Sequence, residues 1–156
     1  KKIMTCWIAV IDSEKQLMTL SNGGHNEAFL VRSGKTLVLE FPGPVVGVGP
    51  RGKYENVEFQ IFPGDILILY TDGLIEAIAK DGNMIGSERL QNALPLIVKE
   101  TPRETENEIR AWHQKLAQVG PQADDITILA VQLATFSKYK KKQKKEAINC
   151  ICKISP

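Results

Sequence analysis

Residues 63–77 read PGDILILYTDGLIEA and hold the most informative pattern in this sequence. A Pro-Gly turn leads into five apolar residues, 66–70, and a short continuous apolar run bounded by turn signals predicts a buried strand. The strand carries the carboxylate of Asp72 to its end, where Gly73 lets the chain change direction sharply. The sequence therefore predicts a carboxylate held at one edge of a sheet.

A second stretch, residues 123–131, reads ADDITILAV and has the opposite order, with two carboxylates before an apolar β-branched strand. If the two strands are antiparallel neighbours, Asp72 and Asp124 meet at one edge of the sheet. Converging carboxylates repel one another unless a cation lies between them, and all-oxygen sites suit hard cations such as Mg²⁺ or Mn²⁺. From spacing alone, a turn acid at Asp72 and an ordinary loop acid at Asp124 remain an equal alternative.

The composition limits the class of protein. At 156 residues, with 43% hydrophobic and 24% charged residues, the chain has the size and balance of one soluble globular domain, and it has no apolar run of the ~20 residues that a membrane helix needs. Residues 137–156 hold seven of the 20 basic and one of the 18 acidic side chains, which leaves an acidic body and argues against a nucleic-acid surface.

The cysteines and the lysine-rich end indicate the cellular setting. Three cysteines without Cys-x-x-Cys spacing predict neither a disulfide framework nor a zinc site, so a reducing, cytoplasmic setting fits best. We expect a folded domain over residues 1–136 and a basic, disordered tail over 137–156. A membrane or nucleic-acid adaptor role for the lysines is a weaker alternative.

The remaining pattern predicts an α+β fold of mostly antiparallel strands, with two helices before the last strand. Strands are expected at 3–11, 16–21, 28–32 and 36–41 as a meander, at 56–62 in a pair with the central strand, and from Ile126. A short helix fits 74–79. A helix capped by Ser87 should kink at Pro95, and a capping box at residues 101–104 opens the next helix, where His113 is expected to be structural or solvent-facing.

Three motifs in this order carry a family resemblance: NGGHN at 22–26, TDGLIEA at 71–77 and DDIT at 124–127. Together they resemble the SpoIIE/RsbU-type branch of the metal-dependent (PPM, type 2C) serine/threonine protein phosphatases, from about Thr5 to Leu133. The resemblance implies an antiparallel β-sandwich flanked by helices, the αββα arrangement. The family's early Asp-x-x-Gly-x-Gly motif is absent from this sequence, so we expect the chain to be the C-terminal two-thirds of such a domain, incomplete at its N-terminus.

The resemblance also implies the site. Asp72 and Asp124 match ligands of a centre holding two or more Mg²⁺ or Mn²⁺ ions. Asp125 stands where many relatives carry Asn, and it is expected to support the site or cap the turn. Glu76 matches an acid of an additional metal site in some relatives, and His25 stands where other relatives carry Asp. A solvated acid at Glu76 and a turn histidine at His25 are the alternatives.

The function implied by the resemblance is hydrolysis of phosphoserine or phosphothreonine on a regulatory protein, an anti-sigma-factor antagonist in relatives. A metal-activated water is the nucleophile there, so no catalytic side chain is expected. The alternative is a catalytically inactive, phosphatase-like binding module or truncated fragment that holds a partner protein. A missing helix layer would expose apolar surface, which predicts a homodimer.

Overall fold

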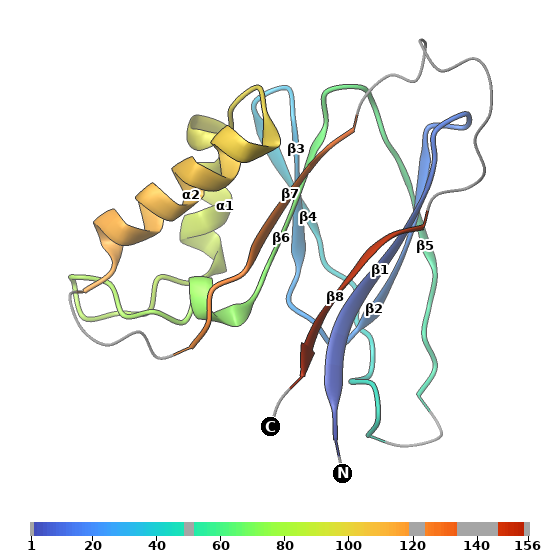
Figure 1. Ribbon diagram of the computed structural model, residues 1–156, viewed down its shortest axis with the longest axis horizontal. Coiled ribbons are helices and arrows are strands. Elements are labelled where there is room, and N and C mark those ends of the chain that lie inside the picture. The colour runs from blue at the N-terminus through green and yellow to red at the C-terminus, as the bar shows by residue number, and fades with distance from the viewer. Residues whose placement is uncertain (1, 49–51, 119–123, 134–146, 155–156) are drawn as a thin grey trace. The chain divides into compact units, whose positions relative to one another are not determined.

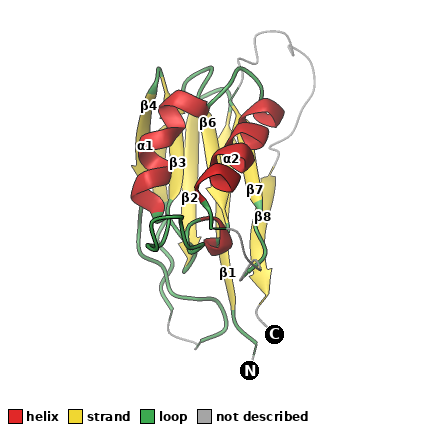
Figure 2. Cartoon of the chain, turned by 90° about the vertical axis from the view of Figure 1, so that its left-hand side faces the viewer, coloured by secondary structure: helices red, strands yellow, loops and turns green. Residues whose placement is uncertain are grey.

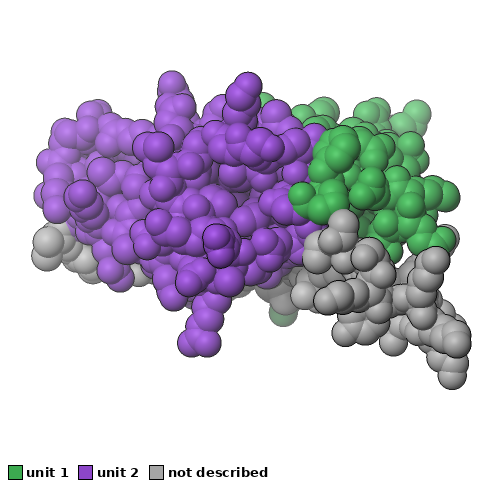
Figure 3. Space-filling model, turned by 90° about the horizontal axis from the view of Figure 1, so that it is seen from above, with its two compact units in different colours: residues 1–25, 40–63, 134–156 green, residues 26–39, 64–133 purple. Residues whose placement is uncertain are grey.

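The computed structural model describes residues 2–48, 52–118, 124–133 and 147–154, and these contain two antiparallel four-stranded sheets and two α-helices (Figure 1). The chain divides into two compact units, coloured separately in Figure 3. Unit 1 comprises residues 1–25, 40–63 and 134–156, and unit 2 comprises residues 26–39 and 64–133. The predicted α+β class is confirmed.

Unit 2 contains the central strand and its sheet, in the order β4 (Lys35–Leu39), β3 (Ala28–Arg32), β6 (Ile66–Tyr70) and β7 (Ile128–Gln132). Every neighbouring pair is antiparallel, and all five residues of β6 are buried. In the β6–β7 ladder, Tyr70 lies opposite Ile128. The predicted antiparallel adjacency of these two strands is therefore confirmed.

Two helices, α1 (Ser87–Ile97) and α2 (Pro102–Leu116), cover one face of this sheet (Figure 2). Helix α1 packs against β3 and β4, and α2 packs against β7. Alternate residues of the strands point to this face, as the two-residue period of a strand requires. The core between sheet and helices consists of Phe29, Val31, Ile66, Ile68, Tyr70, Leu74, Leu90, Leu94, Ile109 and Ile128.

Helix α1 continues past Pro95, where the sequence predicted a kink. Proline has no backbone N–H, so the carbonyl of Gln91 loses its helical donor. The hydroxyl of Thr36 on β4 donates to that carbonyl instead, at 3.1 Å. The prediction that Ser87 caps this helix is wrong, because Ser87 is the first helical residue and Gly86 occupies the cap position with a φ of 76°.

Helix α2 begins with the predicted capping box. The backbone N–H of Glu104 donates to the hydroxyl of Thr101 at 3.2 Å, and that hydroxyl donates to the Glu104 carboxylate at 2.7 Å. His113 in the last turn is buried, so the solvent-facing alternative for it is wrong. Val119, expected on the inner face of this helix, lies outside the described residues.

Unit 1 contains the second sheet, in the order β5 (Val57–Gln60), β2 (Leu17–Gly23), β1 (Met4–Asp12) and β8 (Ala147–Ile154). Strand β8 pairs with β1, although the sequence predicted no ordered element in the tail. Residues 137–146 and 155–156 of that tail lie outside the described residues. The predicted domain boundary at residue 136 stays a prediction.

Two predicted strand pairings are wrong. Strands β2 and β3 belong to different sheets, so the first forty residues are not one meander, and β5 pairs with β2 and not with the central strand β6. The side-chain amide of Asn22 donates to the carbonyls of His25 and Phe41, and its oxygen accepts from the backbone N–H of His25. The turn after β2 is therefore organised by the buried side-chain amide of Asn22 and is not a tight hairpin.

No helix among the described residues has the length and apolar character needed to cross a membrane.

A buried ion pair ties β3 to the start of β6, and its loss should destabilise unit 2. The guanidinium of Arg32 donates to both carboxylate oxygens of Asp65, at 2.9 and 2.7 Å, and the Asp65 side chain is only 2% exposed. We expect Arg32→Met to lower the free energy of unfolding in urea by about 3 kcal/mol, because it removes the guanidinium that balances a buried carboxylate.

The matched control is Arg110→Met, which breaks an exposed pair with Glu106 on α2. Exposed ion pairs of this kind contribute about 0.5 kcal/mol to the free energy of unfolding. An equal loss in the two variants would contradict a special role for the buried pair.

The buried His113 should make stability depend on pH. Burial lowers the pKa of His113 below its usual value of 6.5. Above pH 6.5 the side chain is neutral in both the folded and the unfolded protein. Below pH 6.5 the unfolded chain binds the proton more readily than the folded protein does. The free energy of unfolding should therefore fall as the pH drops from 7 towards 5.

In the His113→Gln variant this part of the decline should be absent, as measured by urea unfolding at several pH values. His25→Gln, which replaces the other histidine of the chain, is the matched control. An unchanged pH dependence in His113→Gln would contradict the assignment.

Candidate metal centre

The hydroxyl of Thr71 joins the end of β6 to the segment that precedes β7. Thr71 is buried, its hydroxyl donates to the carbonyl of Asp125 at 3.0 Å, and it accepts from the backbone N–H of Thr127 at 2.9 Å. The backbone N–H of Thr71 donates to the carbonyl of Thr127, also at 3.0 Å. This three-bond clamp extends the β6–β7 pairing beyond the ladder and fixes the two segments that carry the candidate carboxylates.

Asp72 begins a tight 3-10 turn, Asp72–Leu74, that follows directly on β6. The carbonyl of Asp72 accepts from the N–H groups of Ile75 and Glu76, each at 2.9 Å, and its carboxylate accepts from the N–H of Gly73 at 3.1 Å. Leu74 is fully buried in the core and anchors the turn. The Asp72 side chain itself is half-buried.

Gly73 lies directly against the opposite segment. A Cβ atom at this position would lie 2.6 Å from the carbonyl oxygen of Asp125 and 3.0 Å from that of Asp124. Contacts this short force the backbone to move, so only glycine permits the approach. The predicted meeting of the Asp72 turn and the Asp124–Asp125 segment is present in the structure.

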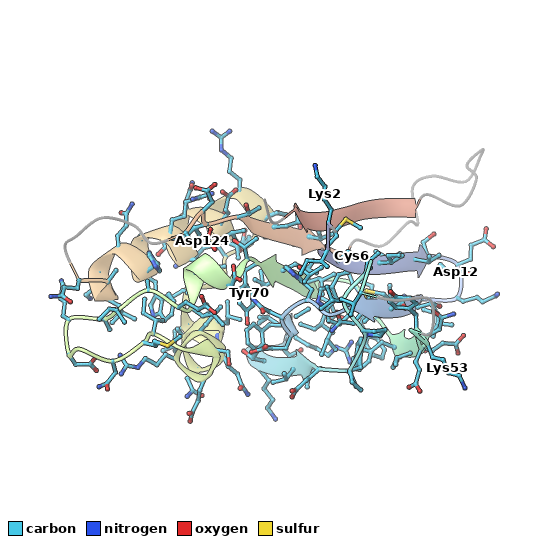
Figure 4. The ribbon with its side chains drawn as sticks, turned by 90° about the horizontal axis from the view of Figure 1, so that it is seen from below. Lys2, Cys6, Asp12, Lys53, Tyr70 and Asp124 are labelled. Carbon is cyan, nitrogen blue, oxygen red and sulfur yellow. The ribbon has the colours of Figure 1, made fainter. Side chains whose placement is uncertain are left out.

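The carboxylates at this edge differ in exposure. Asp124 and Asp125 are exposed, and the Asp124 carboxylate accepts from the backbone N–H of Asp125 at 2.8 Å. Figure 4 labels Asp124 together with Tyr70, the last residue of β6, at this end of unit 2. The carboxylates of Asp72 and Asp124 thus extend from adjoining segments of one sheet edge.

These residues fit a hard divalent cation. Their donors are carboxylate oxygens, and Mg²⁺ in proteins is commonly held by one or two carboxylates together with several waters. Among the described residues no group of three or more His, Cys, Asp or Glu side chains gathers in a metal-binding arrangement. Asp72 and Asp124 would therefore supply the carboxylates, and water or a phosphate oxygen would complete the coordination.

The three additional site residues have different positions. Glu76 is exposed, and the predicted helix over 74–79 is wrong, because the chain continues from the 3-10 turn into a small hairpin with a bridge between Ile78 and Met84. The carbonyl of Asp125 accepts from Thr71, which agrees with a supporting role, while its side chain is exposed. A metal-ligand role for either residue stays a prediction.

His25 belongs to unit 1 and has partners within that unit. Its Nδ1 is 3.0 Å from the hydroxyl of Thr5, and its backbone N–H donates to the side chain of Asn22. This is the arrangement expected for a histidine that stabilises its own turn. A metal role for His25 also stays a prediction.

Sequence analysis missed one supporting group, Thr71, whose hydroxyl forms the clamp. The strand residue before it, Tyr70, also has a distinctive environment. Tyr70 is buried and stacks on Phe29 at a centroid distance of 5.7 Å, and burial together with the Glu27 carboxylate raises the pKa of its phenol. The sequence signal that could have revealed Thr71 is the Tyr-Thr pair at the end of an apolar strand, just before Asp-Gly.

Comparison with known proteins shows the family to which the sequence is related. The family model described as Stage II sporulation protein E (SpoIIE) matches residues 1–134. Protein IcfG of Synechocystis sp. is 33% identical over 91 residues, which are 58% of this chain and 14% of that protein. The chain therefore spans about a seventh of the curated relative.

Solved structures share the fold. The manganese-presoaked phosphatase domain of the cell fate determinant SpoIIE from Bacillus subtilis matches 90% of this chain and 59% of its own, with a TM-score of 0.66 and 18% identity. The SiaA-PP2C domain of Pseudomonas aeruginosa matches 76% of this chain and 47% of its own, with a TM-score of 0.65 and 24% identity. The RsbU and RsbW domains of a Mycobacterium tuberculosis protein match 84% of this chain and 36% of their own, with a TM-score of 0.67 and 20% identity.

Adding a methyl group at Gly73 should separate the two carboxylate segments. We expect Gly73→Ala to weaken Mn²⁺ binding in isothermal titration calorimetry at least tenfold, because the Asp125 carbonyl must move to admit the Cβ. Gly34→Ala is the control: that glycine lies in the turn between β3 and β4 with open space around it, so its replacement costs only the ~1 kcal/mol of an unfavourable φ. Unchanged Mn²⁺ affinity in Gly73→Ala would contradict this role.

Proposed function

Because the chain belongs to the SpoIIE family, we propose that the protein containing it is a metal-dependent phosphatase that hydrolyses phosphoserine or phosphothreonine on another protein. The observation that carries this proposal is the Thr71 clamp, which holds Asp72 beside the Asp124–Asp125 segment. Solved domains with this fold include phosphatase domains of SpoIIE and SiaA.

In the proposed site, Asp72 and Asp124 would hold Mg²⁺ or Mn²⁺. When bound, such cations neutralise charge on the phosphoryl oxygens and lower the pKa of a water. Without them the carboxylates of Asp72 and Asp124 would repel a phosphate group. The chain's own contribution is to fix the carboxylates before the ligand arrives: the 3-10 turn orients Asp72, and the clamp holds the opposite segment.

The two histidines of the chain have contacts within the fold. His25 is engaged with Thr5 and Asn22 in unit 1, and His113 is buried on α2. Tyr70 is neutral at physiological pH, as an ordinary tyrosine is, so it adds no negative charge behind the carboxylates.

We further propose that the substrate is a phosphorylated regulatory protein of the anti-sigma-factor-antagonist type and that the reaction takes place in the cytoplasm. This part of the proposal is supported by the family and by the RsbU and RsbW domains that share the fold. A homodimer stays a prediction.

The test is Mn²⁺-dependent hydrolysis of a small aryl phosphate by the full-length gene product that contains this chain. Asp72→Asn and Asp124→Asn should each lower kcat/KM at least a hundredfold, since a neutral amide coordinates a hard cation far more weakly than a carboxylate. The matched control is Glu58→Gln on β5, an exposed acid of unit 1, which should leave kcat/KM unchanged.

Removal of Mn²⁺ with a chelator should abolish turnover, and adding Mn²⁺ or Mg²⁺ back should restore it. Turnover that survives both the chelator and Asp72→Asn would overturn the metal-dependent mechanism. A folded protein that binds a phosphoprotein without any turnover would favour the non-catalytic binding module instead.

A further inference from the structure

A small hairpin, residues 77–86, continues directly from the candidate metal centre. The N–H of Gly86 donates to the carbonyl of Ile75, the residue that closes the Asp72 turn, at 2.8 Å. The N–H of Ile85 donates to Ala77 at 2.9 Å, and Ile78 bridges Met84. Movement of this hairpin would therefore disturb the carboxylate turn itself.

The hairpin is held from two further sides. The N–H of Lys80 donates to the carbonyl of Leu116, and the N–H of Gln118 donates to that of Ile78, at 3.0 and 2.8 Å, so one edge is joined to the end of α2. At the tip, Asp81 pairs with Arg89 of α1 at 2.7 Å. These attachments hold the hairpin in one position on unit 2.

The two faces of the hairpin have different surroundings. Residues alternate between faces along each arm, and bridged partners share a face. Ala79 and Ile85 point inward and are 2% and 1% exposed, which is enough to anchor the hairpin on the core. On the outer face, Ile78 and Met84 are 45% and 52% exposed although they lie side by side. We call Ile78 and Met84 the outer pair.

The outer pair is not required to hold the hairpin, because the inner face and the hydrogen bonds already do so. Two adjoining exposed apolar side chains near the candidate metal centre offer a surface on which an apolar side chain of a partner can pack. Methionine suits such a surface because its side chain adapts to differently shaped partners. The exposed cationic residue Lys80 follows Ile78 by two residues, in the turn that joins the two arms of the hairpin, so a positive charge lies close to the outer pair in the chain.

We propose that the outer pair and Lys80 form a docking surface for the phosphoprotein substrate and bind a segment that carries an apolar side chain beside an acidic one. This inference rests on the proposed phosphatase function. The apolar side chain packs on Ile78 and Met84, and the acidic group pairs with Lys80. Because the hairpin begins where the Asp72 turn ends, docking there brings the phosphorylated residue to the carboxylates.

The test measures peptide binding and does not depend on turnover. Two fluorescent peptides of equal length and charge carry a non-hydrolysable phosphonate analogue of phosphoserine flanked by glutamates. One has leucines beside them and the other has serines. We expect the protein to bind the leucine peptide about tenfold more tightly in fluorescence anisotropy with Mg²⁺ present, the discrimination expected for one apolar contact.

The Ile78→Ser/Met84→Ser double variant should bind the two peptides equally, and Lys80→Glu should weaken both. Leu96→Ser is the matched control: Leu96 is an apolar residue of α1, 81% exposed, at the end of the helix away from the hairpin, and its replacement should preserve the preference. Thermal unfolding checks that every variant is folded.

Three outcomes of the binding experiment overturn the proposal. They are equal or undetectable binding of the two peptides by the wild-type protein, loss of the preference in Leu96→Ser, and a preference that survives the double variant. If the double variant instead abolishes a dimer of the wild-type protein in sedimentation, a second copy occupies the surface and the proposal is also overturned. Failure of the proposed phosphatase function is distinguishable, because it is measured as absent aryl phosphate turnover.

Discussion

The hydroxyl of Thr71 makes two hydrogen bonds across the gap between the end of β6 and the start of β7, and the candidate site depends on them. Antiparallel pairing brings the two strands together, but the ladder ends at Tyr70 and Ile128, before the carboxylates. Beyond that point, like charges would push the segments apart. A buried hydroxyl that both donates and accepts holds them in place, since leaving either bond unmade would cost a buried polar group its partner.

The turn at Asp72 links this edge to the rest of unit 2. Leu74 anchors the turn in the core, and the carbonyl of Ile75 accepts a hydrogen bond from the hairpin. The hairpin in turn is joined to the start of α1 and the end of α2. The same few residues thus connect the carboxylates to the packing of α1 and α2 on the sheet. The precision of the site therefore depends on the core of unit 2 as well as on the carboxylates themselves.

Much of the local structure could be predicted from the sequence. The buried strand before Asp72, the capping box of α2 and the strand following Asp124–Asp125 are all present, because each depends on a local pattern of apolar residues or cap chemistry. The predictions that failed involve partners distant in the sequence. Pro95 remains inside α1 because Thr36, on strand β4, donates to the carbonyl that the proline leaves without its helical donor. No pattern within the helix could reveal this contact.

The sequence by itself determined most of the elements, their order and the residue types of the candidate hard-cation site, because periodicity, turn chemistry and carboxylate spacing act within a few residues. Only the tertiary structure decided which strands pair. It separated β2 from β3, paired β5 with β2, and added β8 beside β1, since these pairings depend on contacts between residues distant in the sequence. It also decided that Gly73 lies against the carbonyls of Asp124 and Asp125, a contact between residues about fifty positions apart that depends on the folded β6–β7 edge.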